Sequence, residues 1–209
     1  MQNFVKLYRP KFDAAKAIYH DRKICCDAVN PNELAFPVSK KGNNNNTQFV
    51  AWRNWLSFEQ GNPEQLDPIN LKSRIRFVFE LCLSSKLYYP ELWYQYATFE
   101  KNAGDVEAAT QIYYRATKSI PHSELLTFAF ADHQELRNDI DSAKEIYENF
   151  LKLYPSALVY INYQRFARRS FGAKGLEEAR SIFKRARKDR RENACSHYVY
   201  TAAGMYYLV

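Results

Sequence analysis

The feature that most constrains this fold is a short motif that recurs along the chain, which we call motif A. In residues 93–100 it reads WYQYATFE; related copies begin at Trp52, Tyr160 and Tyr200, with a weaker one at Thr127. Each copy places large or apolar side chains at positions i, i+3 and i+6, which share one face of a helix. The motif therefore predicts a series of helices that bury the same stripe. The stripe comprises Trp52, Trp55, Phe58, Trp93, Tyr96, Phe99, Tyr160, Tyr163, Phe166 and Tyr200.

A second pattern, motif B, alternates with the first. It consists of alanine, isoleucine at i+3 and an aromatic residue at i+4, and it begins at Ala15, Ala109, Ala143 and Ala179, with a looser copy ending at Phe79. The starts of successive A motifs are unevenly spaced, and the interval from Trp52 to Trp93 is the longest. The step from the motif B aromatic to the next motif A is steadier, as shown by the intervals Phe79–Trp93, Tyr113–Thr127, Tyr147–Tyr160 and Phe183–Tyr200. A nearly constant B-to-A step with variable A-to-B loops predicts an all-α fold of stacked helical hairpins.

These motifs divide the chain into three parts. Residues 1–24 are expected to form a motif B helix of an incomplete repeat, and residues 25–48, with two prolines and four consecutive asparagines, a linker. The repeat array should occupy residues 49–209. Its expected elements are hairpins at about 49–88, 90–120, 122–153 and 156–191, then an unpaired motif A helix at 194–209. Since no polar cap follows that helix, we expect the sequence to be part of a longer protein.

The turns between the motifs support this division. Gly104-Asp105 and Asn138-Asp139 occupy the same place before a motif B helix. Glycine or asparagine can end a helix in the left-handed conformation, and aspartate can cap the first amides of the next helix. Glu59 and Glu100 each follow a phenylalanine of motif A, and we expect both to pair with an arginine or amide of a neighbouring repeat.

Composition and motif content argue against several classes of protein. No apolar run approaches the ~20 residues that span a bilayer, and the charged N-terminal segment lacks the apolar core of a secretory signal. The four cysteines include no CxxC pair, which favours a reducing compartment, the cytosol or nucleus. The four histidines are scattered, and no phosphate-binding, nucleophile or metalloprotease motif occurs. We therefore expect no metal, no cofactor and no enzymatic activity.

The net charge of +7 is concentrated at the end of the chain. Residues 1–157 hold 19 basic and 19 acidic side chains, whereas residues 158–209 hold 11 and 4. Several of these cations fall outside the apolar stripe of their predicted helices, and four of them recur at i, i+4, i+7 and i+11. The candidate contact residues for a partner protein or RNA are Arg165, Arg168, Arg169, Arg180, Lys184, Arg187, Lys188 and Arg191.

Three interpretations of these cations remain open. They can neutralise an acidic protein segment or RNA phosphates, form a nuclear import signal within residues 184–191, or lie on a solvated helix face with some arginines stacked on aromatic rings. Because no aromatic side chains are arranged as a stacking platform for bases, any RNA contact is expected to be non-specific.

The paired motifs resemble HAT (half-a-TPR) repeats, which stack helical hairpins into an α-α solenoid. More specifically, the chain resembles the suppressor-of-forked family, which includes the large HAT-repeat subunit of cleavage stimulation factor and its fungal Rna-fourteen counterpart. The runs 158–161, 165–169 and 199–203 carry most of this resemblance, with further likeness at Trp52 and residues 75–83.

The resemblance implies a nuclear scaffold in pre-mRNA 3′-end cleavage and polyadenylation. Members of the family hold other subunits of that complex and form homodimers through the C-terminal part of the HAT array. The alternatives are a HAT scaffold of a splicing complex and a basic module that contacts RNA directly.

Overall fold

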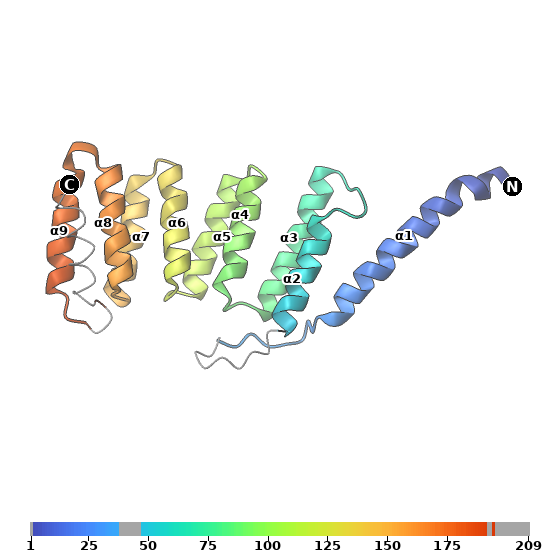
Figure 1. The fold of residues 1–209 in the computed structure, drawn as a ribbon, viewed down its shortest axis with the longest axis horizontal. Coiled ribbons are helices and arrows are strands. Elements are labelled where there is room, and N and C mark those ends of the chain that lie inside the picture. The colour runs from blue at the N-terminus through green and yellow to red at the C-terminus, as the bar shows by residue number, and fades with distance from the viewer. Residues whose placement is uncertain (1, 38–46, 192–193, 195–209) are drawn as a thin grey trace. The chain divides into compact units, whose positions relative to one another are not determined.

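Helices account for all the regular structure in the described part of the chain, residues 2–37, 47–191 and 194 of the computed structural model (Figure 1). The chain divides into two compact units, residues 1–104 and 105–209. The first contains α1 (Gln2–Ala28), α2 (Thr47–Gln60), α3 (Pro68–Ser85) and α4 (Pro90–Asn102). The second contains α5 (Val106–Ser119), α6 (Glu124–Leu136), α7 (Ile140–Leu153), α8 (Ala157–Ser170), the short 3-10 helix η1 (Gly172–Lys174) and α9 (Gly175–Lys188).

The observed helices follow the alternation of the two motifs. Motif A lies in α2, α4, α6 and α8, and motif B lies in α1, α3, α5, α7 and α9. Helix α1 continues to Ala28, past its expected end at residue 24, because no proline or glycine interrupts the chain between there and Pro31. The asparagine run falls in residues 38–46, and the helix expected at 194–209, with Tyr200, falls almost wholly in 195–209; both segments lie outside the described residues. The division into domains stays a prediction.

The turn chemistry expected before two motif B helices is confirmed. Gly104 and Asn138 have φ values of 80° and 62°, in the left-handed region that glycine and asparagine tolerate best. Asp105 accepts a hydrogen bond from the backbone N–H of Ala108 at 3.0 Å, and Asp139 accepts one from Ser142 at 3.1 Å. Each aspartate thus caps α5 or α7 at an amide that has no partner within its own helix.

The same three-ring cluster, an aromatic triplet, recurs along the described part of the chain. It forms wherever a motif B helix is followed by a motif A helix and the number of residues from the motif B aromatic to motif A is small and nearly constant. The motif B aromatic packs on the residues at i+3 and i+6 of the next motif A helix, with ring centroids 4.7–5.9 Å apart. Such ring pairs stabilise a fold beyond the area that they bury. The triplets are Phe79–Tyr96–Phe99, Tyr113–Phe130–His133 and Tyr147–Tyr163–Phe166. The constant B-to-A step thus brings equivalent rings together between successive repeats.

The predicted stripe residues are buried to different extents. Phe58, Phe99 and Phe183 are half-buried. The others in the described residues are at most 8% exposed: Trp52, Trp55, Trp93, Tyr96, Tyr113, Tyr147, Tyr160, Tyr163 and Phe166.

Helix α1 joins α2 differently. Its motif B aromatic, Tyr19, is 64% exposed, and Arg22 takes over the contact by lying over the ring of Phe58 at 5.7 Å. The interval along the chain from Tyr19 to Trp52 is more than twice the step found where the triplets form. The longer connection does not hold the two motifs in the register that pairs their rings.

Buried carboxylates provide the second link between repeats, as expected for Glu59 and Glu100. Glu100 is fully buried; Arg76 of α3 donates to both its oxygens at 2.5 and 2.6 Å, and Lys72 lies 3.2 Å away. Glu59 of α2 accepts from Arg22 of α1 at 2.6 and 3.1 Å. Two parallel hydrogen bonds from one guanidinium fix both the distance and the orientation of the helices that carry them.

Enlarging the motif B alanine should disrupt this packing. Ala143 is fully buried, so Ala143→Leu must displace its neighbours and should lower the free energy of unfolding by about 1–3 kcal/mol. Urea unfolding followed by far-UV circular dichroism measures the change. Ala15→Leu is the matched control, because Ala15 holds the same motif position in α1 but is exposed. Equal stability of the two variants would contradict the packing role.

Removing the buried carboxylate of α4 should loosen the first unit. Glu100→Ala leaves a cavity and two cations without their partner, and should cost about 1–3 kcal/mol, moderated because Arg76 and Lys72 are 38% and 24% exposed and can rehydrate. Hydrogen exchange of amides in α3 and α4 should accelerate. Glu107→Ala, which removes a carboxylate 68% exposed and paired with Arg137, should change the stability by less than about 0.5 kcal/mol. Unchanged exchange in α3 and α4 would contradict the ion-pair role.

Candidate partner-contact surface

Helix α9 carries the basic side chains that the sequence singled out, and its own sequence explains why it forms. Ile182 and Ala186 are buried, one turn apart, on the face that packs against α8. Glutamates occupy the first turn and Arg185, Arg187 and Lys188 the last, which suits the helix dipole at both ends. At Gly175, a Cβ atom would lie 2.8 Å from two backbone carbonyl oxygens of α8, so only glycine allows this close approach.

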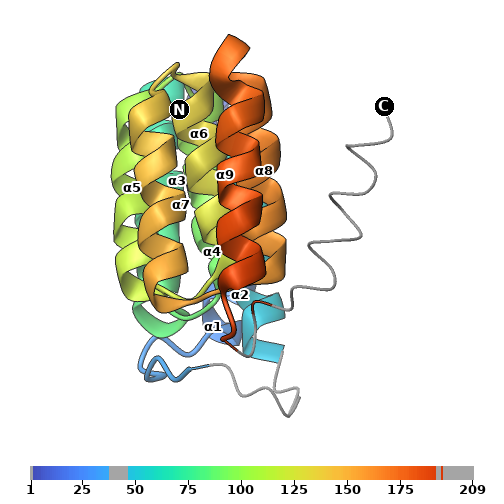
Figure 2. The same ribbon diagram turned by 90° about the vertical axis from the view of Figure 1, so that its left-hand side faces the viewer.

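On its other flank, α9 lies beside α7, as Figure 2 shows. Glu148 of α7 accepts hydrogen bonds from the Tyr163 hydroxyl of α8 at 2.7 Å and from Arg185 of α9 at 3.0 Å. The Arg185 guanidinium also lies 5.9 Å from the ring centroids of Tyr160 and Tyr163. Burial acts to raise the pKa of Glu148, but the hydrogen bonds from Arg185 and Tyr163 outweigh it and leave this pKa below its ordinary value.

Arg185 is a structural residue that the sequence analysis missed. It lies between the apolar stripe and the predicted basic ridge, so the helical periodicity assigned it to neither. A usable signal was present in α7 and α8, where the Tyr163 hydroxyl needs a polar partner once its ring is buried and Glu148 is a half-buried carboxylate.

Two of the predicted contact residues are held within the protein. Arg169 donates to both oxygens of Glu135 at 2.7 and 2.6 Å, and these hydrogen bonds lower the pKa of Glu135. Arg191 donates to Asp189 and also to the backbone carbonyls of Leu151 and Lys152, at 3.0 and 3.1 Å. Arg191 therefore satisfies carbonyls in the last turn of α7 that have no partner within that helix.

Asp189 connects this arginine to α8. It accepts from the Tyr160 hydroxyl at 2.9 Å and from the backbone N–H and side chain of Arg191. The guanidinium of Arg191 lowers the pKa of Asp189 to about 2. The spacing of Arg191 along the sequence fits the predicted basic ridge, but the structure places this residue after the end of α9, where the helical spacing no longer applies.

The remaining predicted cations fall into two groups. Arg165, Arg168 and Arg180 are exposed, and each has an interaction within the chain. Lys184, Arg187 and Lys188 are exposed and form no hydrogen bond or ion pair with any residue that the structure describes. We call these three residues the α9 basic surface. They lie at i, i+3 and i+4 and so share one side of the helix.

Comparison with two other motif B helices, α3 and α7, distinguishes Lys184. The residue after the motif B aromatic is Glu80 in α3 and Glu148 in α7, and each is hydrogen-bonded to the tyrosine at i+3 of the next motif A helix, Tyr96 or Tyr163. Lys184 occupies this position in α9. The corresponding i+3 residue of the next copy in the sequence is alanine, which has no hydroxyl group.

The described residues contain no group of three or more histidine, cysteine, aspartate or glutamate side chains placed to hold a metal ion. They also contain no helix long and apolar enough to cross a membrane. Cys82 is buried, which raises its pKa to about 12 and keeps the thiol protonated.

The Asp189 contacts predict a specific loss of stability in acid. An aspartate whose pKa is lowered by folding, here from 3.8 to about 2, stabilises the fold above the higher value and loses that contribution as the pH falls through the lower one. Asp189→Asn should therefore cost about 1–2 kcal/mol near neutral pH, allowing for solvent around Arg191, and less than half as much near pH 2.

Urea unfolding of the wild type and the variant between pH 2 and 7 measures this difference. Exposed Asp13→Asn in α1 is the control. A stability difference between wild type and Asp189→Asn that does not change with pH would contradict the role of the carboxylate charge.

Comparison with known proteins places the chain in a family. The family described as Suppressor of forked protein (Suf) matches residues 1–208. Cleavage stimulation factor subunit 77 of Arabidopsis thaliana is 41% identical over 201 residues, covering 96% of this chain and 26% of that protein. The mRNA 3′-end-processing protein RNA14 of Candida glabrata is 27% identical, covering 82% of this chain and 29% of that protein, and Protein suppressor of forked of Drosophila melanogaster is 28% identical, covering 76% and 26%.

The chain thus spans between a quarter and a third of the length of these relatives. The all-α HAT-repeat fold expected from the two motifs agrees with the observed helices and with the family. Both the motif resemblance and the whole-chain match lead to the same conclusion: this chain belongs to the suppressor-of-forked family.

Proposed function

We propose that this chain is a non-catalytic scaffold segment in nuclear pre-mRNA 3′-end cleavage and polyadenylation. The observation that carries the proposal is its 41% identity, across 96% of its length, to a protein named as a cleavage stimulation factor subunit. A second relative is named as an mRNA 3′-end-processing protein. The buried carboxylates Glu59 and Glu100 are each held by an arginine in an ion pair between helices. This structural use of the buried acids supports a scaffold role.

The α9 basic surface is the proposed contact for another processing factor, and its ligand is an acidic protein segment. In α3 and α7 the residue after the motif B aromatic is a carboxylate that binds the next repeat. Lys184 replaces that carboxylate, and Arg187 and Lys188 extend the positive charge by one turn. A partner on this side of α9 must therefore supply acceptors rather than donors, as aspartate and glutamate do.

An acidic protein fits this surface better than RNA does. Three clustered cations neutralise few phosphates, and affinity for nucleic acid grows with the number neutralised. Proteins that bind single strands also stack bases on aromatic rings, and no exposed aromatic side chain lies on α9. The large exposed apolar residue of this helix is Leu176, at 47% exposure.

Self-association through the HAT array is the second part of the proposal, and it rests on the family resemblance. A dimeric scaffold would present each contact surface twice, which strengthens binding to a partner that is itself repeated. Sedimentation of the full-length protein should give twice the monomer mass, and a monomer at micromolar concentration would contradict this part.

Charge reversal of the α9 basic surface tests the contact. The triple variant Lys184→Glu, Arg187→Glu, Lys188→Glu should abolish binding of the acidic partner while preserving the circular dichroism spectrum. The matched control is Arg9→Glu, Lys16→Glu, Lys23→Glu on α1, which makes the same change in net charge at exposed positions elsewhere. Each tagged variant is incubated with nuclear extract, and the bound proteins are identified by mass spectrometry.

The outcomes separate the interpretations. We expect cleavage and polyadenylation subunits with the wild type and the α1 variant, and their loss with the α9 variant. Recovery of splicing proteins instead would assign the chain to a splicing complex. Equal recovery with all three would remove the α9 surface as the contact, and titration of a short oligouridine at several salt concentrations would reveal direct RNA binding by a steep salt dependence.

A further inference from the structure

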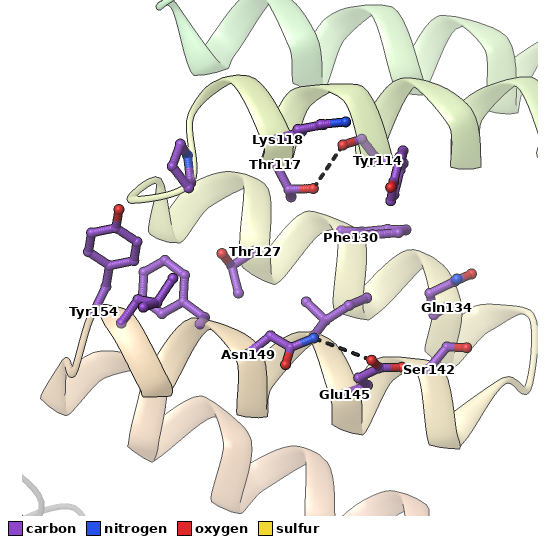
Figure 3. A pocket seen from close by; sticks show the side chains of 14 residues that line it. Tyr114, Thr117, Lys118, Thr127, Phe130, Gln134, Ser142, Glu145, Asn149 and Tyr154 are labelled. Carbon is purple, nitrogen blue, oxygen red and sulfur yellow. Dashed lines mark hydrogen bonds between the residues drawn. The ribbon is translucent and has the colours of Figure 1, made fainter.

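Helices α5, α6 and α7 of the second unit enclose a groove of about 500 Å³ (Figure 3). This volume is within the range of about 300–1,000 Å³ that is usual for ligand sites. Phe130, Ile146 and Phe150 contribute apolar surface inside it. Tyr114 and Leu153 also line it, and they are 58% and 72% exposed.

A buried amide in this groove lacks a partner. Gln134 is only 7% exposed, and its side-chain oxygen Oε1 is buried with no hydrogen bond in the described structure. It stands where Glu100 stands in α4, but the residue that corresponds to Arg76 is Thr110, which contacts His133 at 2.9 Å and accepts from Arg137 at 2.7 Å. Between α5 and α6, the ion pair that joins α3 to α4 is therefore replaced by a buried acceptor without a donor. An unsatisfied buried acceptor lowers the stability of the fold unless a ligand supplies the donor.

The two threonine hydroxyls that line the groove are used elsewhere. Thr117 donates to the carbonyls of its own helix, and Thr127 donates to the Ser123 carbonyl at 2.9 Å. Gln134 itself lines the groove, so a molecule that enters it can supply the missing donor when the side chain turns toward it.

Opposite charges lie on the two walls of the groove. Lys118 lies in the last turn of α5 and Glu145 in the first half of α7, and Figure 3 shows them on opposite sides of the groove. An occupant complementary to this groove has an acidic group on the side that faces α5 and a basic group on the side that faces α7.

We propose that this groove binds an extended apolar segment of a partner protein, with an acidic side chain at Lys118, a basic one at Glu145, and a backbone N–H that donates to Gln134. Successive side chains of an extended chain point to opposite sides, so an acid and a base that face opposite walls stand an odd number of positions apart. A helical segment fits poorly, because its backbone N–H groups beyond the first turn are already used within the helix. The site is separate from the α9 basic surface and does not depend on it.

A random heptapeptide phage library, panned on the whole chain, supplies the probe. The selected peptides should carry an acid and a base an odd number of positions apart among apolar residues, and fluorescence anisotropy measures their affinity. Gln134→Met keeps the size of the side chain but removes the acceptor, and should weaken binding about tenfold. Gln164→Met in α8 is the matched control: Gln164 is 8% exposed and has an amide nitrogen without a partner, yet it does not line the groove.

The double variant Lys118→Glu, Glu145→Lys tests the polarity. It should lose the selected peptides and bind peptides whose two charges are exchanged. The proposal is overturned if panning yields no binding peptide, if Gln134→Met and Gln164→Met bind equally to the selected peptides, or if those peptides become helical when bound, as seen by circular dichroism.

Discussion

The fold depends on the packing of one motif B aromatic on two rings of the following motif A helix. A single hairpin cannot make this contact, since its two aromatic partners belong to the next repeat. The distance along the chain from motif B to motif A is therefore nearly constant wherever the triplet forms, while the loop within each hairpin varies in length. Where the step more than doubles, between Tyr19 and Trp52, the triplet is replaced by an arginine lying on Phe58.

Polar positions beside the triplet determine how firmly neighbouring repeats are joined. Where motif A offers a tyrosine hydroxyl at i+3, motif B provides glutamate next to its aromatic, as Glu80 and Glu148 show. Where the i+3 residue is Phe130, which has no hydroxyl group, the residue next to the motif B aromatic is Tyr114. The Tyr114 side chain is exposed. The substitutions are thus matched across the interface, because a buried tyrosine hydroxyl without a partner would destabilise it.

The sequence predicted the parts of the structure that follow from local periodicity. Repeat spacing, helix caps and the roles of Glu59 and Glu100 depend on residues within one or two turns of each other or on the regular step between motifs. The contacts of Arg191 and Arg185 could not be predicted in this way, since they depend on how three helices meet. A helical wheel shows which side of α9 a cation occupies, but not that the chain turns after Lys188 and brings Arg191 to the end of α7.

The groove could not be predicted from the sequence, for a related reason. Gln134 appears in the sequence as an ordinary polar substitution for glutamate, and its significance depends on Thr110, one helix away, which replaces arginine at the facing position. Only the loss of both partners leaves a buried acceptor beside an open groove. The same positions that join two repeats elsewhere therefore become available to a ligand when both sides change. In a repeat protein, a binding site can arise by weakening one internal interface while the aromatic triplet, here Tyr113 with its two partners, keeps the helices in place.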